Sequence, residues 1–326
     1  MLEGALMTGE AEFARRTEPF RKELLAHCYR MLASVEEAED VVQETYLRAW
    51  RSYSSFAGRS SLRVWLYRIA TNACLTALEQ RGRRALPSGL GAPATDLTPG
   101  TAPTDVAFVE PMADSLVTSS ADPATIVTTR ESLRLALIAA LQYLPAKQRA
   151  VLILREVLAF PAAEVATMLD TSVAAVKSTL QRARARLDEI APSRGEVSEP
   201  SSPEAQALLA EYITGFENAD TAALERALRA DAAIEMVGTT TWFNGRVMCL
   251  RLLTEAVGSP GDWRMIPLIA NGQPAVAAYG RTPGSDYEPY GVAVLTPTPT
   301  GLSHIHVFST PSLVTRFGFP ASLPAD

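Results

Sequence analysis

Cationic, amide and small side chains gather on one face of the segment 173–187, in a pattern that suits nucleic-acid binding better than catalysis. A helix there puts the apolar residues on a single stripe, formed by Val173, Val176, Leu180, Ala183 and Leu187. Lysine and arginine contact phosphates, glutamine reads base edges, and alanine permits close approach in the major groove. The candidate DNA-contacting residues of this face are Ser172, Ala174, Ala175, Lys177, Ser178, Gln181, Arg182 and Arg184.

A second helix is predicted just before this face. Val165, Met168 and Leu169 share one side of the segment 162–169, Asp170 lies at the turn, and Ser172 is a good N-cap for the next helix. Two helices joined in this way are typical of a helix-turn-helix whose second helix enters the major groove. Glycine is usual where Asp170 stands, but aspartate tolerates the left-handed conformation. The alternative is an ordinary amphipathic helix with a solvated basic face.

The first 84 residues are predicted to be helical from residue 10 onwards. Ser34 and Glu37 form a capping box for a helix that begins near Val35. Off its apolar stripe lies an acidic and amide group that is either a solvated helix face or a surface for docking on a basic protein partner: Asp40, Gln43, Glu44 and Leu47. Further on, a loop and a cationic helix end hold residues to which the family resemblance given below assigns contacts with single-stranded DNA: Phe56, Arg59, Asn72, Arg81, Arg83 and Arg84. Phe56 is equally consistent with a buried loop anchor.

Charge and proline divide the chain into blocks. Residues 10–86 carry thirteen Lys and Arg against ten Asp and Glu, and residues 128–190 carry nine against six. Residues 87–127 carry five acidic residues, no Lys or Arg, and repeated prolines, so we expect an extended and largely irregular linker. A second linker is expected at 191–203. The net charge of -6 for the whole chain therefore hides two slightly basic blocks.

The remaining block, 204–318, changes to an α+β pattern. Residues 204–218 and 221–230 are predicted to be helical, and β-type runs follow at 275–279, 290–295 and 303–308. Alternation places His304 and His306 on one strand face, which is either a pocket face or an exposed edge. Candidate pocket residues are Asp231, Glu235, Trp242, His304 and His306. No pairing among them follows from the sequence, so no catalytic residue is assigned.

Cysteine usage and hydropathy exclude several classes. Cys28, Cys74 and Cys249 lie far apart and fit neither a disulfide framework nor a metal site, as expected in a reducing cytosol. No apolar run is long enough to span a membrane, and the N-terminus lacks a signal-peptide pattern. We therefore expect a cytoplasmic protein without a metal, a cofactor or a membrane partner.

Three segments resemble the sigma-70 family of RNA polymerase sigma factors. Residues 144–187, LPAKQRAVLILREVLAFPAAEVATMLDTSVAAVKSTLQRARARL, resemble region 4, which in the family reads the −35 promoter element and touches the β flap. EEAEDVVQETYLRAW (36–50) resembles the region 2 helix that docks on the β′ clamp. SLRVWLYRIATNACLTALEQRGRR (61–84) resembles the part that melts and reads the −10 element. The absence of regions 1.1 and 3 between them implies the extracytoplasmic-function (ECF) subfamily.

This resemblance implies two all-α sigma domains, region 2 at 10–86 and a region 4 helix-turn-helix at 128–190. The linker 87–127 between them would thread toward the RNA exit path, as sigma linkers do. The segments YITGFENADTAALERALRADAAIEMVG and TWFNGRVMCLRLLTEAV resemble SnoaL-like domains, so 204–318 is predicted to be an α+β cone. Such a domain implies built-in regulation of the sigma factor, with a small molecule or a protein as its candidate ligand.

The leading hypothesis is a sigma factor, not an enzyme, that binds core RNA polymerase and promoter DNA. A SnoaL-like isomerase or hydrolase fused to a DNA-binding module is one alternative. A simple helix-turn-helix repressor or activator is another, although it would have no use for the docking face at Asp40–Leu47.

Overall fold

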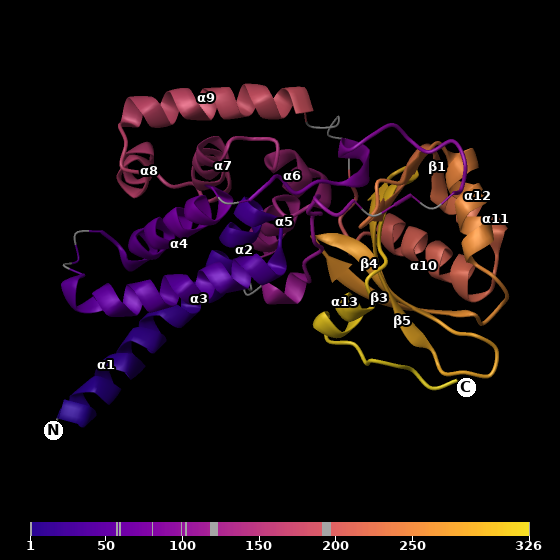
Figure 1. Cartoon of the computed structure of the whole chain (residues 1–326), viewed down its shortest axis with the longest axis horizontal. Helices are drawn as coiled ribbons and strands as arrows, with labels where there is room; N and C mark the ends of the chain where they lie inside the picture. Colours follow the sequence, from indigo (N-terminus) through magenta and orange to yellow (C-terminus); the bar gives the residue numbers. More distant parts are fainter. Residues whose placement is uncertain are drawn as a thin grey trace. The chain divides into compact units, whose positions relative to one another are not determined.

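The computed structural model describes residues 2–56, 58, 60–79, 81–98, 100–101, 103–117, 123–190 and 197–325. The chain divides into two compact units, each made from two stretches of sequence (Figure 1). The first unit is Met1–Arg84 with Ser115–Pro192, and the second is Ala85–Asp114 with Ser193–Asp326. Residues 85–114, here called the linker segment, therefore belong to the same unit as the C-terminal residues.

The first unit is helical throughout its regular structure. Its helices are α1 (Leu2–Thr17), α2 (Arg21–Leu32), α3 (Val35–Ser52), α4 (Leu62–Glu79), α5 (Pro123–Glu131), α6 (Leu135–Leu141), α7 (Ala146–Leu152), α8 (Ala162–Met168) and α9 (Val173–Ile190). A π-helical turn, Ile153–Val157, continues α7. Helix α5 begins inside the stretch for which the sequence predicted an irregular linker.

The boundary between α2 and α3 follows from two residues. Ala33 ends α2 in the left-handed conformation, with φ of 55°. The next residue, Ser34, accepts a hydrogen bond from the Glu37 backbone N–H at 3.3 Å, so the predicted cap is confirmed. The core of this part is formed by fully buried side chains of α2, α3 and α4, among them Leu24, Tyr67 and Leu66.

The two helical parts of the first unit pack against each other. The guanidinium of buried Arg149 donates to the Met31 carbonyl, and Arg30 Nη2 donates to Ser132 Oγ at 2.7 Å. The Tyr67 ring contacts the Phe160 ring with 5.0 Å between centroids. Residues from before and after the linker segment therefore share one core.

The second unit is built around a six-stranded sheet of order β2-β1-β6-β5-β4-β3. The strands are β1 (Leu228–Val237), β2 (Trp242–Asn244), β3 (Trp263–Ala270), β4 (Gln273–Gly280), β5 (Glu288–Thr298) and β6 (Gly301–Phe308). In this sheet β1 and β6 pair in parallel, and the other pairs are antiparallel. The unit's helices are α10 (Pro203–Glu217), α11 (Thr221–Ala227), α12 (Arg246–Ala256) and α13 (Pro311–Arg316).

One face of the sheet forms the main core of the second unit. Ile234 of β1, Ile305 of β6 and Val276 of β4 pack there with side chains of α10, α11 and α12, such as Phe216 and Leu253. Because side chains alternate along a strand, the neighbours of Ile234 and Ile305 point to the opposite face. Glu235, His304 and His306 therefore lie on the face away from these helices.

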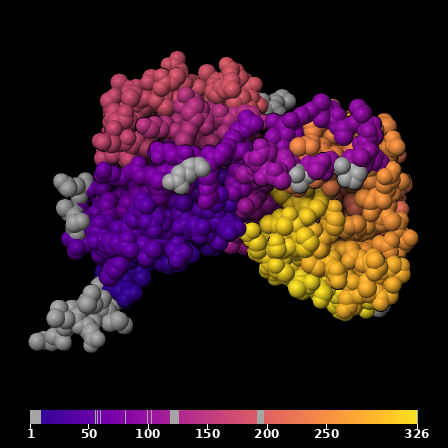
Figure 2. Space-filling view, in the orientation of Figure 1, coloured from indigo at the N-terminus to yellow at the C-terminus, as the bar shows by residue number. Residues whose placement is uncertain are grey.

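The linker segment runs along the second unit as an ordered part of it. The space-filling view shows its purple atoms lying directly on the orange atoms of the C-terminal residues (Figure 2). Ala94 N–H donates to the carbonyl of Trp242 in edge strand β2 at 2.7 Å, and Asn271 N–H donates to the Met112 carbonyl at 2.9 Å. The segment contains few regular turns, yet Leu86, Val109 and Met112 are buried.

Two predictions of the apolar pattern are wrong in detail. Val173, the first residue of α9, is 39% exposed and does not join the buried stripe. The helix expected at 221–230 ends at Ala227, and β1 begins at Leu228. Within the described residues no helix is long and apolar enough to cross a membrane.

Candidate nucleic-acid interface and associated sites

Helices α8 and α9 form the predicted helix-turn-helix. Val165 of α8 and Val176 and Leu187 of α9 are buried, and the two helices contact each other. Asp170 has φ of 49°, which is the left-handed conformation expected at the turn. Ser172 Oγ accepts a hydrogen bond from Ala175 N–H at 3.1 Å and caps α9. The geometry therefore presents the N-terminal half of α9 as a free helix face.

The predicted DNA-contacting residues lie together on this face. Those that are exposed are Ser172, Ala174, Lys177, Ser178, Gln181, Arg182 and Arg184, and Ala175 is half-buried. Arg182 makes a 3.2 Å hydrogen bond to Thr179 Oγ1, and Arg184 forms an ion pair with Glu156. Exposed ion pairs contribute little to stability, so Arg184 can exchange Glu156 for a phosphate. The contact of Arg182 is a single exposed hydrogen bond to a hydroxyl group, which a phosphate or base atom can likewise replace.

The proposed polymerase-docking residues lie on one side of α3. Asp40 and Gln43 are exposed, and Leu47 has 45% of its surface accessible. Glu44 is partly exposed and pairs with Arg48 at 2.6 Å, one helical turn along. An accessible leucine beside acidic and amide groups is suited to a protein interface with a polar rim.

The residues proposed for the −10 element are instead engaged within the first unit. Arg84 pairs with Glu37 at 2.7 Å, and Arg81 also pairs with Glu37. The Arg83 guanidinium lies 3.9 Å from the centroid of the Tyr143 ring. Nothing in the sequence indicated that Glu37 would collect two of these cations, because it lies far from both of them along the chain.

Two more residues of this group have contacts of their own. Phe56 is half-buried and its ring lies 4.8 Å from the ring of Trp65, so it anchors its loop in this structure. Asn72 is exposed and donates to the Met168 carbonyl of α8 at 3.4 Å. Arg59 lies outside the described residues.

Three of the candidate pocket residues form a row across the sheet. Strand register places Trp242 of β2 opposite Glu235 of β1, and Glu235 opposite His306 of β6. His306 Nε2 lies 3.5 Å from Glu235 Oε1, and each side chain is at most 4% exposed. Ser88 of the linker segment donates to Glu235 twice, from its backbone N–H at 2.9 Å and its hydroxyl at 3.0 Å. Nothing in the sequence pointed to Ser88.

Burial and partners set the ionisation of this row. Burial by itself would raise the pKa of Glu235, but hydrogen bonds from His306 and Ser88 outweigh it and lower that pKa. Burial and the neighbouring His306 lower the pKa of His304 to about 4. The prediction that His304 and His306 share a face is confirmed, since their rings stack with 6.0 Å between centroids.

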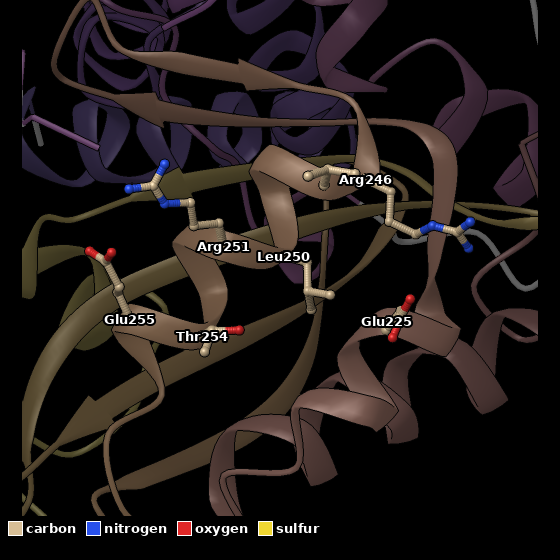
Figure 3. A pocket seen from close by; sticks show the side chains of 7 residues that line it. Glu225, Arg246, Leu250, Arg251, Thr254 and Glu255 are labelled. Atoms are coloured by element: carbon tan, nitrogen blue, oxygen red, sulfur yellow. The ribbon is translucent and has the colours of Figure 1, made fainter. Parts of the chain in front are cut away.

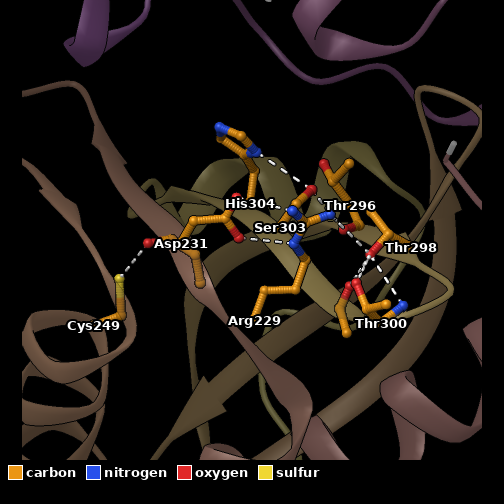
Figure 4. Close-up of polar contacts among 10 residues, drawn as sticks. Arg229, Asp231, Cys249, Thr296, Thr298, Thr300, Ser303 and His304 are labelled. Carbon is orange, nitrogen blue, oxygen red and sulfur yellow. Dashed lines mark hydrogen bonds and ion pairs between the residues drawn. The ribbon is translucent and has the colours of Figure 1, made fainter. Parts of the chain in front are cut away.

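Asp231 lies apart from that row. It is exposed and forms a two-point ion pair with Arg229, both contacts at 2.8 Å, as Figure 4 shows. The hydrogen bond from Arg229 lowers the pKa of Asp231. The five candidates therefore do not converge on a single pocket.

A surface groove lies instead between α11 and α12 (Figure 3). It encloses about 490 Å³ and is lined by Glu225, Arg246, Val247, Leu250, Arg251, Thr254 and Glu255. Its charged residues are of both signs and none of the candidate pocket residues lines it. Among the described residues no group of three or more His, Cys, Asp and Glu side chains is placed to hold a metal ion.

Comparisons with known proteins agree with this geometry. The chain matches the families Sigma-70 region 2 over residues 17–84 and Sigma-70, region 4 over residues 134–187. It is 50% identical over 316 residues to the ECF RNA polymerase sigma factor SigG of Mycobacterium tuberculosis, covering 96% of this chain and 85% of that protein. It is 30% identical over 170 residues to the RNA polymerase sigma-H factor of Pseudomonas aeruginosa, covering 52% of this chain and 81% of the relative.

The crystal structure of the extracytoplasmic function sigma factor SigJ of Mycobacterium tuberculosis has the same fold. The two superpose with a TM-score of 0.62 at 22% identity, over 94% of this chain and 99% of that one. The predicted architecture, two helical sigma domains followed by an α+β domain, is confirmed. The 50% identity with SigG, over 85% of that protein, establishes the family of this chain. The chain belongs to the ECF RNA polymerase sigma factors, which direct promoter recognition and transcription initiation.

Proposed function

We propose that the first unit holds the polymerase-binding and promoter-binding surfaces, and that the second unit regulates them. The exposed face of α9 carries this proposal, because seven of its eight predicted contact residues are open to solvent on a capped helix. In the proposal this face enters the major groove of the −35 element and α3 docks on the β′ clamp. Region 4 also meets the β flap.

The compact first unit is proposed to be a state that has not yet bound a promoter. The −10 and −35 elements are about 25 base pairs apart, which is about 85 Å of duplex at about 3.4 Å a step. Yet Asn72, proposed for the −10 element, contacts α8 of the helix-turn-helix. Both elements can be bound only after α4 and α8 separate, which would also release Arg83 from Tyr143.

Transcription in vitro tests the proposed function directly. The full chain is mixed with core polymerase and with a promoter library that varies the −35 and −10 elements, and initiation is measured. Initiation that depends on both elements supports the proposal. An inability to bind core polymerase, with the second unit present or removed, would leave a DNA-binding enzyme as the better hypothesis.

Leu47→Arg is expected to weaken binding to core polymerase by about 1–3 kcal/mol, because it replaces an accessible apolar contact with a charge. Affinity is measured by fluorescence anisotropy of labelled protein against core enzyme. Arg51→Ala is the matched control, since Arg51 is an exposed residue at the end of the same helix. If the unmodified chain and both variants bind core polymerase with equal affinity, α3 is not part of the interface.

Arg182→Ala is expected to cost about 1–3 kcal/mol of −35 binding and to relax the preference at one base position, as removal of a base reader does. Binding is measured by titration of duplexes that differ at single −35 positions. Arg186→Ala is the comparison, because Arg186 lies one turn further from the helix N-terminus and pairs with Glu189. A loss of equal size on every duplex would make Arg182 a phosphate contact.

A further inference from the structure

We propose that the outer sheet face and the edges of the C-terminal domain are a docking site for the chain's own linker segment, and that polymerase competes for that segment. The occupant is part of this structure, since residues 85–114 form one compact unit with residues 193–326. The inference rests on the proposed function and on the expectation, from the family resemblance, that the linker threads into polymerase. The inference adds the surface that keeps the linker from polymerase and the residues of that surface that bind the linker.

The first attachment is Ser88 on Glu235. One residue supplies two donors, a backbone N–H and a hydroxyl, and they reach the two oxygens of a single carboxylate. Glu235 is 3% exposed and its other neighbour is the imidazole of His306. A hydrogen bond to a buried charged group is among the stronger ones in proteins, so the loss of either donor from Ser88 destabilises the buried carboxylate.

The second attachment follows edge strand β2 and the turn before it. Trp242 Nε1 donates to the Gly91 carbonyl at 2.8 Å, and Ala94 N–H donates to the Trp242 carbonyl at 2.7 Å. Gly100 N–H then donates to Thr241 Oγ1 at 2.8 Å. The linker segment thus uses the unpaired edge of the sheet, which would otherwise be open to other strands.

The third attachment is the turn between β3 and β4. Ala113 bridges to Ala270, Met112 exchanges two hydrogen bonds with Asn271, and the carboxylate of Asp114 accepts the Gly272 N–H at 2.8 Å. Asp114 is one of the five acidic residues of the predicted linker 87–127. In this structure it serves to fasten the segment.

Docking also shortens the connection between region 2 and region 4. Ala85 bridges to Phe108: Ala85 N–H donates to the Ala107 carbonyl and Val109 N–H donates to the Ala85 carbonyl. The residues between Ala85 and Phe108 become a closed loop. Roughly 75 Å of extended chain therefore no longer contributes to the reach of the connection between region 2 and region 4. While the linker segment is docked, it is bound to the second unit and the tether between region 2 and region 4 is short. Release of the segment makes it available for binding to polymerase.

A reversible crosslink at the third attachment tests the competition. Residues that face each other in an antiparallel bridge have Cα atoms about 4.5–5.5 Å apart, within the range of a disulfide. The double variant Ala113→Cys with Ala270→Cys in the full chain is compared oxidised and reduced. We expect oxidation to lower promoter-dependent initiation about tenfold or more, and reductant to restore it. The single variant Ala113→Cys under the same oxidant controls for Cys28, Cys74 and Cys249, which are buried.

Release is tested from the opposite direction with Ser88→Ala and Glu235→Gln. Each is expected to increase the amide exchange rate of Gly100 and Val109 about tenfold and to raise initiation. Asp231→Asn is the matched control, because Asp231 is on the same strand as Glu235 but is exposed and pairs only with Arg229 among the contacts described. It should change neither measurement.

The outcomes separate this inference from the proposed function. If oxidised and reduced double variants initiate equally well, the linker remains docked on active polymerase and the competition is refuted. Unchanged amide exchange in both release variants would also refute it. If the unmodified chain never initiates from a promoter, the proposed function itself fails.

Discussion

A chain that ends at Ile190 is expected to initiate from its promoter about tenfold more often than the full chain at equal concentration with core polymerase. Truncation removes every attachment of the linker segment on residues 193–326, so the segment no longer has to be withdrawn from them. A coupling of about 1–3 kcal/mol, usual between regulatory and functional sites, corresponds to a change of this size. Run-off transcription with a titration of core enzyme separates binding from initiation.

Combining truncation with the linker substitution shows whether they act through one contact. Ser88→Ala should raise initiation in the full chain and have no effect in the shortened one, because Glu235 is absent there. Light scattering must confirm a monomer, since Leu86, Val109 and Met112 lose their covering. Unchanged core binding and initiation after truncation would show that the C-terminal unit does not inhibit.

Local sequence signals were sufficient for the helices and for the helix-turn-helix. Ser34 is a cap because its hydroxyl reaches an N–H three residues on, and Asp170 adopts the left-handed turn expected of it. Each of these features depends on residues close together in the chain. The strand runs at 275–279, 290–295 and 303–308 also lie inside β4, β5 and β6, because alternation is a local pattern.

Contacts between distant residues were beyond the sequence. A proline-rich acidic stretch has the composition of a free tether, and composition does not record that Ser88 meets Glu235, 147 residues away. Likewise, Arg81 and Arg84 look like DNA-contacting cations until the fold brings Glu37 beside them. Exposed groups such as Arg182 and Gln181 were placed correctly on one face, but a single sequence does not tell which of them reads a base.

Lowering the pH from about 6.5 to about 4.5 is expected to lower the unfolding free energy of the first unit by about 2 kcal/mol through His27 alone. His27 is completely buried on α2, with Nε2 2.9 Å from Thr71 Oγ1. Burial, with smaller contributions from Arg30 and Arg63, lowers its pKa to about 3. The unfolded chain takes up a proton near pH 6.5 and the folded chain resists it. This stability is therefore present above pH 6.5 and is lost as the pH falls toward 3.

A neutral side chain of similar reach isolates the charge at His27 as the cause of this acid sensitivity. The His27→Gln variant can still hydrogen-bond to Thr71 and should flatten the acid dependence by about 1 kcal/mol per pH unit between pH 7 and pH 5, whatever its stability at pH 7. Opening free energies of α2 and α4 from native-state hydrogen exchange at pH 7 and 5 measure this slope.

The matched variant in the second unit is His304→Gln, because burial also lowers the pKa of His304, to about 4. It should flatten the slope of β6 and leave that of α2 as it was. Equal slopes in α2 for the unmodified chain and the His27→Gln variant would mean that other groups carry the acid sensitivity of this core.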